Sequence, residues 1–123
     1  MREILFRGKD EGTQEWVYGF YCEKPSPFHI GIEYSIFDNK TISRYTICPE
    51  TVGQYTGLTD KNGKKIFEGD IVKVDDDIYV CFWNECNYEF GFTNSKRDFG
   101  IAYAQEVEVI GNIHDNPELL KGE

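Results

Sequence analysis

Residues 53–74, GQYTGLTDKNGKKIFEGDIVKV, constrain the fold of this chain more than any other segment. The Asn62-Gly63 pair favours the positive φ angles that a tight hairpin turn requires. A second turn signal, Glu68-Gly69-Asp70, precedes the β-branched run of residues 71–74, which is typical of a strand. Two turns so close together predict antiparallel strands, with residues 61–64 holding the register of a hairpin.

Runs of strand-forming residues recur along the rest of the chain, separated by turn-forming residues. They lie at residues 4–6, 15–22, 32–37, 41–48, 78–83, 88–93 and 106–113. Turn signals about every 8–12 residues are expected of a small barrel or sandwich. Short helices are predicted only at residues 99–105 and in a turn that begins at Pro117. The predicted fold class is therefore mostly β, a small antiparallel barrel with little helix.

Loops and strand faces can also be predicted. Prolines place residues 24–27 in a loop and break the chain at Pro49-Glu50, and residues 95–100 are expected to form an exposed loop. Residues 15–22 carry apolar or aromatic side chains on both faces, which predicts a strand in the interior of a sheet. Along residues 78–83, one face is shared by Ile78, Val80 and Phe82.

The last predicted strand, residues 106–113, should pair with a strand of residues 71–92 and close the barrel. Its alternation predicts a buried face with Val107, Val109 and Ile113, and an outward face with Glu106, Glu108 and Asn112. Gly111 interrupts the buried face, which suits a bend or a close backbone approach.

Length and charge restrict the organisation and the partners. A chain of 123 residues suits a single domain, in which residues 1–50 form β hairpins and residues 51–120 form the barrel-like part. The net charge is −9, with six basic and eight acidic residues in 1–50 (net −2) and seven and fourteen in 51–123 (net −7). Because nucleic-acid phosphates are bound by basic surfaces, direct binding to nucleic acid is not expected.

Neither secretion nor a membrane location is predicted. The first twelve residues hold only three consecutive apolar residues, and no apolar run is long enough to span a bilayer. A cytoplasmic location is expected, where the four cysteines would be reduced.

The cysteines and a run of acidic residues are the candidates for a metal site in this sequence. Cys81 and Cys86 could supply half of a zinc site, completed by one or more of Cys22, Cys48, His29 and His114, but their spacings differ from those of paired zinc knuckles. Asp75-Asp76-Asp77 lacks the alternate spacing of a calcium loop and reads as a solvated turn. Packing is the favoured role of the cysteines, and no metal or cofactor is predicted.

Other matches to functional motifs have no supporting context. Asp98-Phe99-Gly100 matches the metal-binding tripeptide of protein kinases, but the chain has neither the glycine-rich loop nor the catalytic loop of that fold. The aromatic residues between Tyr79 and Phe92 are interleaved with acidic residues, which favours core packing over base stacking. His29 and His114 show no local signature of a nucleophilic triad, so no catalytic residue is predicted.

Two long motifs carry a family resemblance. Residues 51–74, together with VIGNIHDNPEL at residues 109–119, resemble the YopX family of phage and prophage proteins, as do residues 2–9 and 15–21. The resemblance implies a small phage-borne protein with a mostly β fold, including an SH3-like barrel in the C-terminal half. It carries over no activity and no catalytic residue.

The function expected from these observations is that of a non-enzymatic module that binds a protein partner or self-associates. A narrower hypothesis is an acidic mimic of DNA that acts on a host protein, with the C-terminal acidic residues on one face. The alternative is a small hydrolase or ligand-binding protein that uses Cys or His in a cleft. A histidine within hydrogen-bond reach of a Cys or Ser inside a pocket would favour that alternative.

Overall fold

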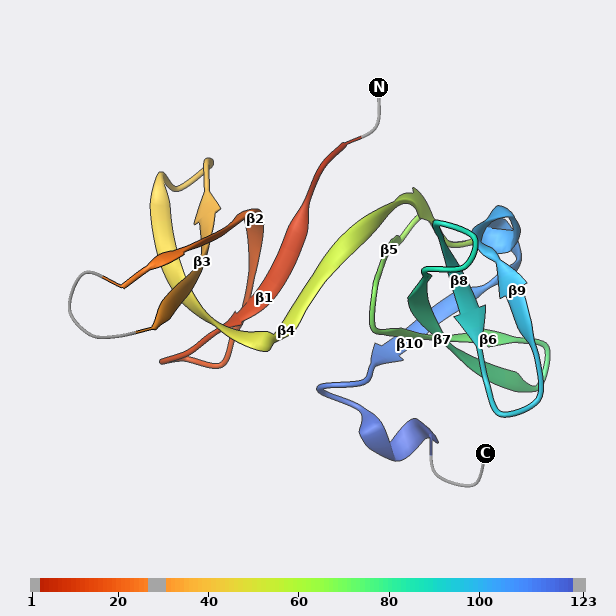
Figure 1. The fold of residues 1–123 in the computed structure, drawn as a ribbon. Coiled ribbons are helices and arrows are strands. Elements are labelled where there is room, and N and C mark those ends of the chain that lie inside the picture. The colour runs from red at the N-terminus through yellow and green to blue at the C-terminus, as the bar shows by residue number, and fades with distance from the viewer. Residues whose placement is uncertain (1–2, 27–30, 121–123) are drawn as a thin grey trace. The chain divides into compact units, whose positions relative to one another are not determined.

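The computed structural model describes residues 3–26 and 31–120 (Figure 1). The strands of this part are β1 (Phe6–Asp10), β2 (Trp16–Pro25), β3 (Ile32–Asp38), β4 (Ser43–Thr59), β5 (Lys65–Phe67), β6 (Asp70–Val74), β7 (Asp77–Asn84), β8 (Glu89–Thr93), β9 (Asp98–Gly100) and β10 (Glu108–Asn112). Two short 3-10 helices, η1 (Ile101–Glu106) and η2 (Pro117–Leu120), lie where short helices were predicted. The predicted mostly β fold class is confirmed. The chain forms two compact units, Met1–Gln54 and Tyr55–Glu123.

The first unit is built from a ring of paired strands. β1 pairs with β2, β2 with β3, β3 with the first part of β4, and β4 returns to pair with β1, all antiparallel. β2 lies between β1 and β3 in the sheet order, as predicted, and pairs with β1 along residues 16–19 and with β3 along residues 20–25. Val17, Ile36 and Ile47 form the buried core, against which partly buried side chains pack: Phe6, Tyr21, Tyr34, Tyr45 and Val52.

β2 buries only one of its two apolar faces. Val17 and Gly19 are buried, whereas Tyr18 and Phe20, which alternate with them, are 44% and 51% exposed. Gly19 lies where the backbone of β3 crosses closely, because a Cβ there would clash with the carbonyl oxygen of Phe37. The missing side chain lets the two strands approach and leaves the aromatic residues on the outside.

The break predicted at Pro49-Glu50 lies inside a strand. β4 continues through Pro49-Glu50, where residues 49–52 bulge opposite Gly8, since Cys48 pairs with Lys9 and Gly53 with Arg7. Proline is tolerated there because a bulge needs fewer ladder donors. The Thr51 hydroxyl stabilises the bulge, accepting from the Lys9 amide at 2.8 Å and donating to the Cys48 carbonyl at 2.6 Å.

The other loop predictions need smaller corrections. β2 extends to Pro25, two residues into the predicted loop at 24–27, whose remaining prolyl position 27 lies outside the described residues. Within 95–100, residues 95–97 form the expected exposed loop, but Asp98–Gly100 is β9, paired with β8. These segments join strands because a neighbouring strand is available to take their hydrogen bonds.

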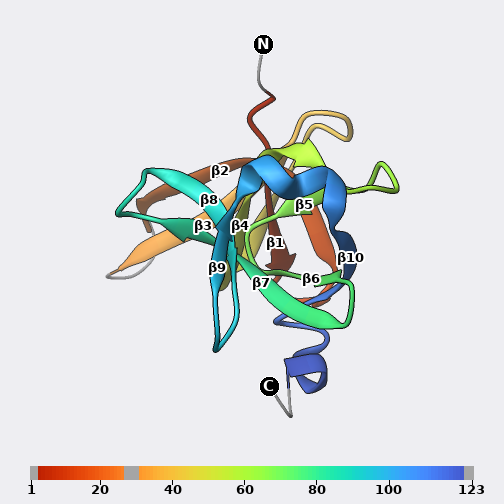
Figure 2. The same ribbon diagram turned by 90° about the vertical axis from the view of Figure 1, so that its right-hand side faces the viewer.

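The second unit contains a five-stranded antiparallel sheet of order β10-β6-β7-β8-β9. The chain returns from β9 to β10 through η1 (Figure 2). The core combines buried residues of the sheet, η1 and β5: Ile66, Val72, Tyr79, Cys81, Phe90, Phe92, Ala104, Val107 and Val109. On β7 the core face is that of Tyr79 and Cys81, while Ile78, Val80 and Phe82 on the other face are half-buried. The SH3-like barrel expected for this half stays a prediction.

The last strand pairs with β6, as predicted, and bends at its glycine. Val109 pairs with Val72 and Gly111 with Ile71, so Ile110 is the extra residue of a bulge. The bulge reverses the side-chain alternation, and the prediction that Asn112 faces outward is therefore wrong. Asn112 is buried, and its side-chain oxygen accepts from the amides of His114 (3.0 Å) and Asp115 (2.9 Å).

Replacement of Gly63 by alanine should cost about 1 kcal/mol of unfolding free energy. Gly63 has a φ of +82°, as the turn prediction required, and nothing lies within 4 Å of a Cβ placed there. The cost is therefore one of backbone conformation alone. The urea midpoint measures it, and Gly12→Ala, in an exposed turn, is the control. An unchanged midpoint for Gly63→Ala would contradict the positive φ.

Val109→Asp should abolish soluble folding, because it places an unpaired carboxylate in the core at a cost of several kcal/mol. The adjacent Glu108→Lys changes a half-buried residue opposite Lys73 and should shift the unfolding free energy by only about 0.5 kcal/mol. Soluble yield and chemical denaturation measure both. If Val109→Asp folds normally and Glu108→Lys does not fold, the buried and outward faces of β10 have been assigned the wrong way round.

Candidate functional site

The side of the first unit's strands that faces away from its core carries a set of residues that we call the cationic–aromatic face, of which Arg7 and Ser35 are buried. It consists of side chains that alternate with the core residues of this unit, on β1 to β4: Arg7, Lys9, Trp16, Tyr18, Phe20, Lys24, Glu33, Ser35, Phe37 and Arg44. Strand register brings them together, since Phe20 pairs with Phe37 and Phe37 pairs with Arg44. A row of two aromatic rings and a guanidinium thus crosses three strands.

Three of the four cations of this face lie over its aromatic rings. The guanidinium carbon of Arg7 is 4.7 Å from the ring centroid of Trp16, and Lys9 Nζ is 5.5 Å from the same ring. The guanidinium carbon of Arg44 is 6.0 Å from the centroid of Phe37. Such cation–π contacts are worth about 0.5–1 kcal/mol at exposed sites, and they limit the positions that these long side chains can take.

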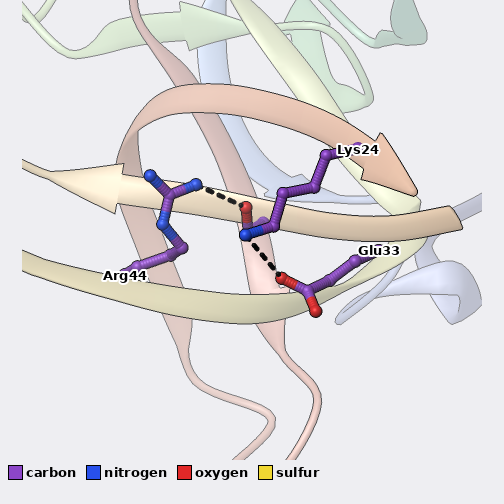
Figure 3. Close-up of polar contacts among 4 residues, drawn as sticks. Lys24, Glu33 and Arg44 are labelled. Carbon is purple, nitrogen blue, oxygen red and sulfur yellow. Dashed lines mark hydrogen bonds and ion pairs between the residues drawn. The ribbon is translucent and has the colours of Figure 1, made fainter. Parts of the chain in front are cut away.

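Polar contacts join the three strands at the other end of the face (Figure 3). Arg44 Nη1 donates to Ser35 Oγ at 3.2 Å, and Lys24 Nζ lies 3.6 Å from Glu33 Oε1. The lysine side chain is 46% exposed and the glutamate 27%, so solvent weakens their attraction. The face holds four cations and one carboxylate, a net of +3 within a chain of net −9.

A hollow of about 180 Å³ lies on β7 to β9 of the second unit, lined by Phe82, Asn84, Asn87, Glu89, Gly91, Asp98, Phe99 and Gly100. Two of its lining residues, Gly91 and Gly100, are glycines that pair across β8 and β9. A Cβ on Gly100 would lie 2.9 Å from Glu89 Oε1, so the glycine makes room for this carboxylate. The other carboxylate, Asp98, accepts a hydrogen bond from the hydroxyl of Thr93. The hollow offers carboxylates and amides, without a cysteine, serine or histidine among its lining residues.

The structure separates the residues considered for catalysis and metal binding. Cys81 is buried in the core, whereas Cys86 is exposed in the turn after β7; Cys22 and Cys48 are half-buried residues of the first unit. His114 is half-buried after β10, and His29 lies outside the described residues. Asp75-Asp76-Asp77 is exposed, with Asp75 at a φ of +53° in the turn before β7. Within residues 3–26 and 31–120, no three His, Cys, Asp or Glu side chains are grouped to hold a metal ion.

Two buried aspartates were missed by the sequence reasoning. Asp60 and Asp70 are each 2% exposed. The Asp60 carboxylate accepts from three backbone amides: Asn62 (2.8 Å) and Lys64 (2.9 Å) at Oδ1, and Val109 (2.8 Å) at Oδ2. Asp70 Oδ2 accepts from the amide of Phe67 at 2.7 Å. Their position before and after turn glycines was the available signal, because aspartate commonly bonds the backbone of its own turn.

These hydrogen bonds decide the protonation of Asp60. Burial raises the pKa of its carboxyl group, but the three amide donors, from Val109, Lys64 and Asn62, outweigh burial and hold the pKa below its ordinary value. In the first unit, burial and a 2.7 Å hydrogen bond to Glu23 raise the pKa of Tyr21. Both groups have structural partners that explain their shifts.

Asp60→Asn should destabilise the protein by about 1–3 kcal/mol at pH 7. Asparagine replaces one of the two acceptor oxygens with an NH2 group, so its side chain cannot accept from all three amides. The lowered pKa makes the contribution of Asp60 complete above about pH 4, the value for an unfolded aspartate, and lost as the pH falls through the folded pKa. The difference in unfolding free energy between wild type and Asp60→Asn should therefore become smaller in acid.

Urea unfolding at pH 7 and at successively lower pH measures this gap. Asp76→Asn, on an exposed residue, is the matched control and should change the unfolding free energy at pH 7 by no more than about 0.5 kcal/mol. A gap that stays constant or widens in acid would mean that the Asp60 carboxylate is not stabilised in its ionised form.

The four thiols should be free, metal-free and graded in reactivity. In the native protein Cys86 should react first with a thiol reagent, and Cys81, which is 1% exposed, should react only on unfolding. Thiol counting with and without denaturant, together with metal analysis by mass spectrometry, tests this; Cys86→Ser identifies the fast phase. Fewer than four thiols in denaturant, or stoichiometric zinc, would refute it.

Comparisons with known proteins place the chain in a family. No curated protein matches it. The solved structure of protein EF1440 from Enterococcus faecalis is similar, with 27% sequence identity, a TM-score of 0.59, and coverage of 98% of this chain and 100% of that chain. In the described part, none of the helices has the length and apolar character to cross a membrane. The family described as YopX protein matches residues 5–121. The chain belongs to the YopX family.

Proposed function

We propose that this chain is a non-enzymatic, phage- or prophage-encoded cytoplasmic protein that binds another protein through the cationic–aromatic face. One observation carries the proposal: Tyr18 and Phe20 are exposed side by side on the outside of β2, beside cations held over aromatic rings. Aromatic residues and arginine are enriched in protein interfaces and supply most of their hot spots.

The strand ring favours recognition by side chains over the addition of a strand. The strands β1 to β4 pair in a ring, in which β2 bonds to β1 along residues 16–19 and to β3 along residues 20–25, so each of the four strands has backbone bonds within the unit. A partner that approaches the outer face meets rings, guanidinium and ammonium groups instead of an open strand edge. Several of these groups are already restrained by contacts with one another, which lowers the entropy cost of binding.

The narrower hypothesis of a DNA mimic receives less support from the side-chain positions. Of the fourteen acidic residues in 51–123, Asp60 and Asp70 are buried and bond to backbone amides. They are not available to imitate phosphates. The mimic remains a variant of the proposal in which the exposed acidic residues of the second unit contact a basic host protein.

The alternative of a small hydrolase or ligand-binding protein that uses Cys or His in a cleft gains no support from the hollow on β7 to β9. Its lining residues supply carboxylates and amides but neither cysteine nor histidine. A nucleophile and base within hydrogen-bond reach would be the starting point for a hydrolytic mechanism.

Affinity capture from a lysate of the native host cell tests the proposal. Wild type should retain at least one protein that the double variant Tyr18→Ser, Phe20→Ser does not. The control Tyr88→Ser, Tyr103→Ser removes two exposed tyrosines of the second unit and should retain it. Denaturation midpoints verify that all three are folded. Equal retention by all three, or no retained protein, would contradict a binding role for this face.

A further inference from the structure

We propose that the occupant of the cationic–aromatic face is an extended acidic segment of polypeptide that also carries aromatic or apolar side chains. This inference rests on the proposed function and specifies the chemistry of the partner. It follows from how the fold distributes charge over the first unit, which the composition of residues 1–50 conceals.

Three of the eight carboxylates in residues 1–50 make hydrogen bonds away from this face. Asp10 Oδ1 accepts from the amides of Gly12 and Thr13, and Asp38 Oδ1 accepts from the amide of Lys40, so both stabilise turns. Glu23 accepts from the hydroxyl of Tyr21, on the opposite face of β2. Glu33, beside Lys24, is the carboxylate of the face itself. The residues that define the face therefore carry more cations than carboxylates, although residues 1–50 are net negative.

Two accessible cations, Arg44 and Lys24, lie on the same face as the exposed rings. Arg7 is only 7% exposed and serves to hold Trp16, whereas Arg44 is exposed and the Lys24 side chain is 46% exposed. Phe20 lies in the same cross-strand row as Arg44, about 10 Å away at the usual strand spacing. Along β2, Lys24 follows Phe20 by four residues, or about 13 Å of extended chain.

An extended peptide matches this arrangement. Its side chains on one face recur about every 7 Å, so an aromatic residue packed on Tyr18 and Phe20 has carboxylates two to four residues away within reach of the cations. Carboxylate paired with arginine forms strong, directional hydrogen bonds. The aromatic contact supplies apolar burial, and the cations select for acidic residues.

A nucleic-acid strand fits the same observations less well. The chain has a net charge of −9, and Lys24 already neighbours Glu33. Binding to a polyanion gains its affinity from many neutralised phosphates, commonly about 6–10, while this face offers few accessible cations. A short acidic peptide interacts only with the face and is less repelled by the rest of the chain.

Fluorescence anisotropy with defined probes tests the inference. The probes are a labelled octapeptide of sequence EEYYEEYY, in which each tyrosine has a glutamate two residues away on the same face, its lysine–tyrosine counterpart KKYYKKYY, and the oligonucleotide dT12. The glutamate–tyrosine peptide should bind at least tenfold more tightly than the other two. Its affinity should fall several-fold between 50 and 300 mM NaCl, because added salt shortens the Debye length, which is about 8 Å at physiological ionic strength. Arg44→Glu and, separately, Phe20→Ser should each weaken binding at least tenfold.

Lys96→Glu, on an exposed lysine of the second unit, makes the same charge change as Arg44→Glu and should leave the affinity unchanged. Equal or tighter binding of dT12 would overturn the inference in favour of nucleic acid. No binding of the acidic peptide, equal binding of the lysine peptide, or insensitivity to both face variants would also overturn it. If lysate capture nevertheless depends on Tyr18 and Phe20, the proposed function stands and only the acidic partner is wrong.

Discussion

The Asp60 carboxylate is the constraint on which the second unit depends. It accepts from two amides of its own turn and from the amide of Val109, so one buried charge joins the β4–β5 hairpin to the last strand. The Lys61 amide donates to the Val107 carbonyl at 3.0 Å and reinforces the same junction. Val107 and Val109 are thereby held against the core formed by β6 to β8. A buried carboxylate is tolerated because the donors replace its lost hydration.

The first unit depends on strand closure. The ring from β1 to β4 directs Val17, Ile36 and Ile47 inward. Gly19 permits the close crossing of β2 and β3 that this closure requires. Because side chains alternate along a strand, enclosing one apolar set pushes Tyr18 and Phe20 outward, together with the cations of neighbouring strands. The proposed binding face is thus a consequence of how the core closes.

Local signals explain what could be predicted from the sequence. Asn62-Gly63 predicted a turn and Pro117 a helical turn, and both are present, because each depends on the φ preferences of one or two residues. Gly111 predicted a bend, which is the bulge at Ile110. The predictions of a chain break at Pro49-Glu50 and of an outward-facing Asn112 were wrong for the same reason. Each residue lies at or next to a bulge, which changes the hydrogen bonds of a strand and the face on which its side chains lie, and a bulge depends on the register of the partner strand.

The amino-acid sequence by itself determined the β class, the main turns and the family resemblance, since these reside in short patterns along the chain. The tertiary structure decided which apolar face is buried, which two aspartates lose contact with water, and where the cations gather. A strand with two apolar faces, such as β2, does not indicate which face is enclosed. Likewise, Arg7, Lys24 and Arg44 are distant in the chain and become one surface only when the strands pair.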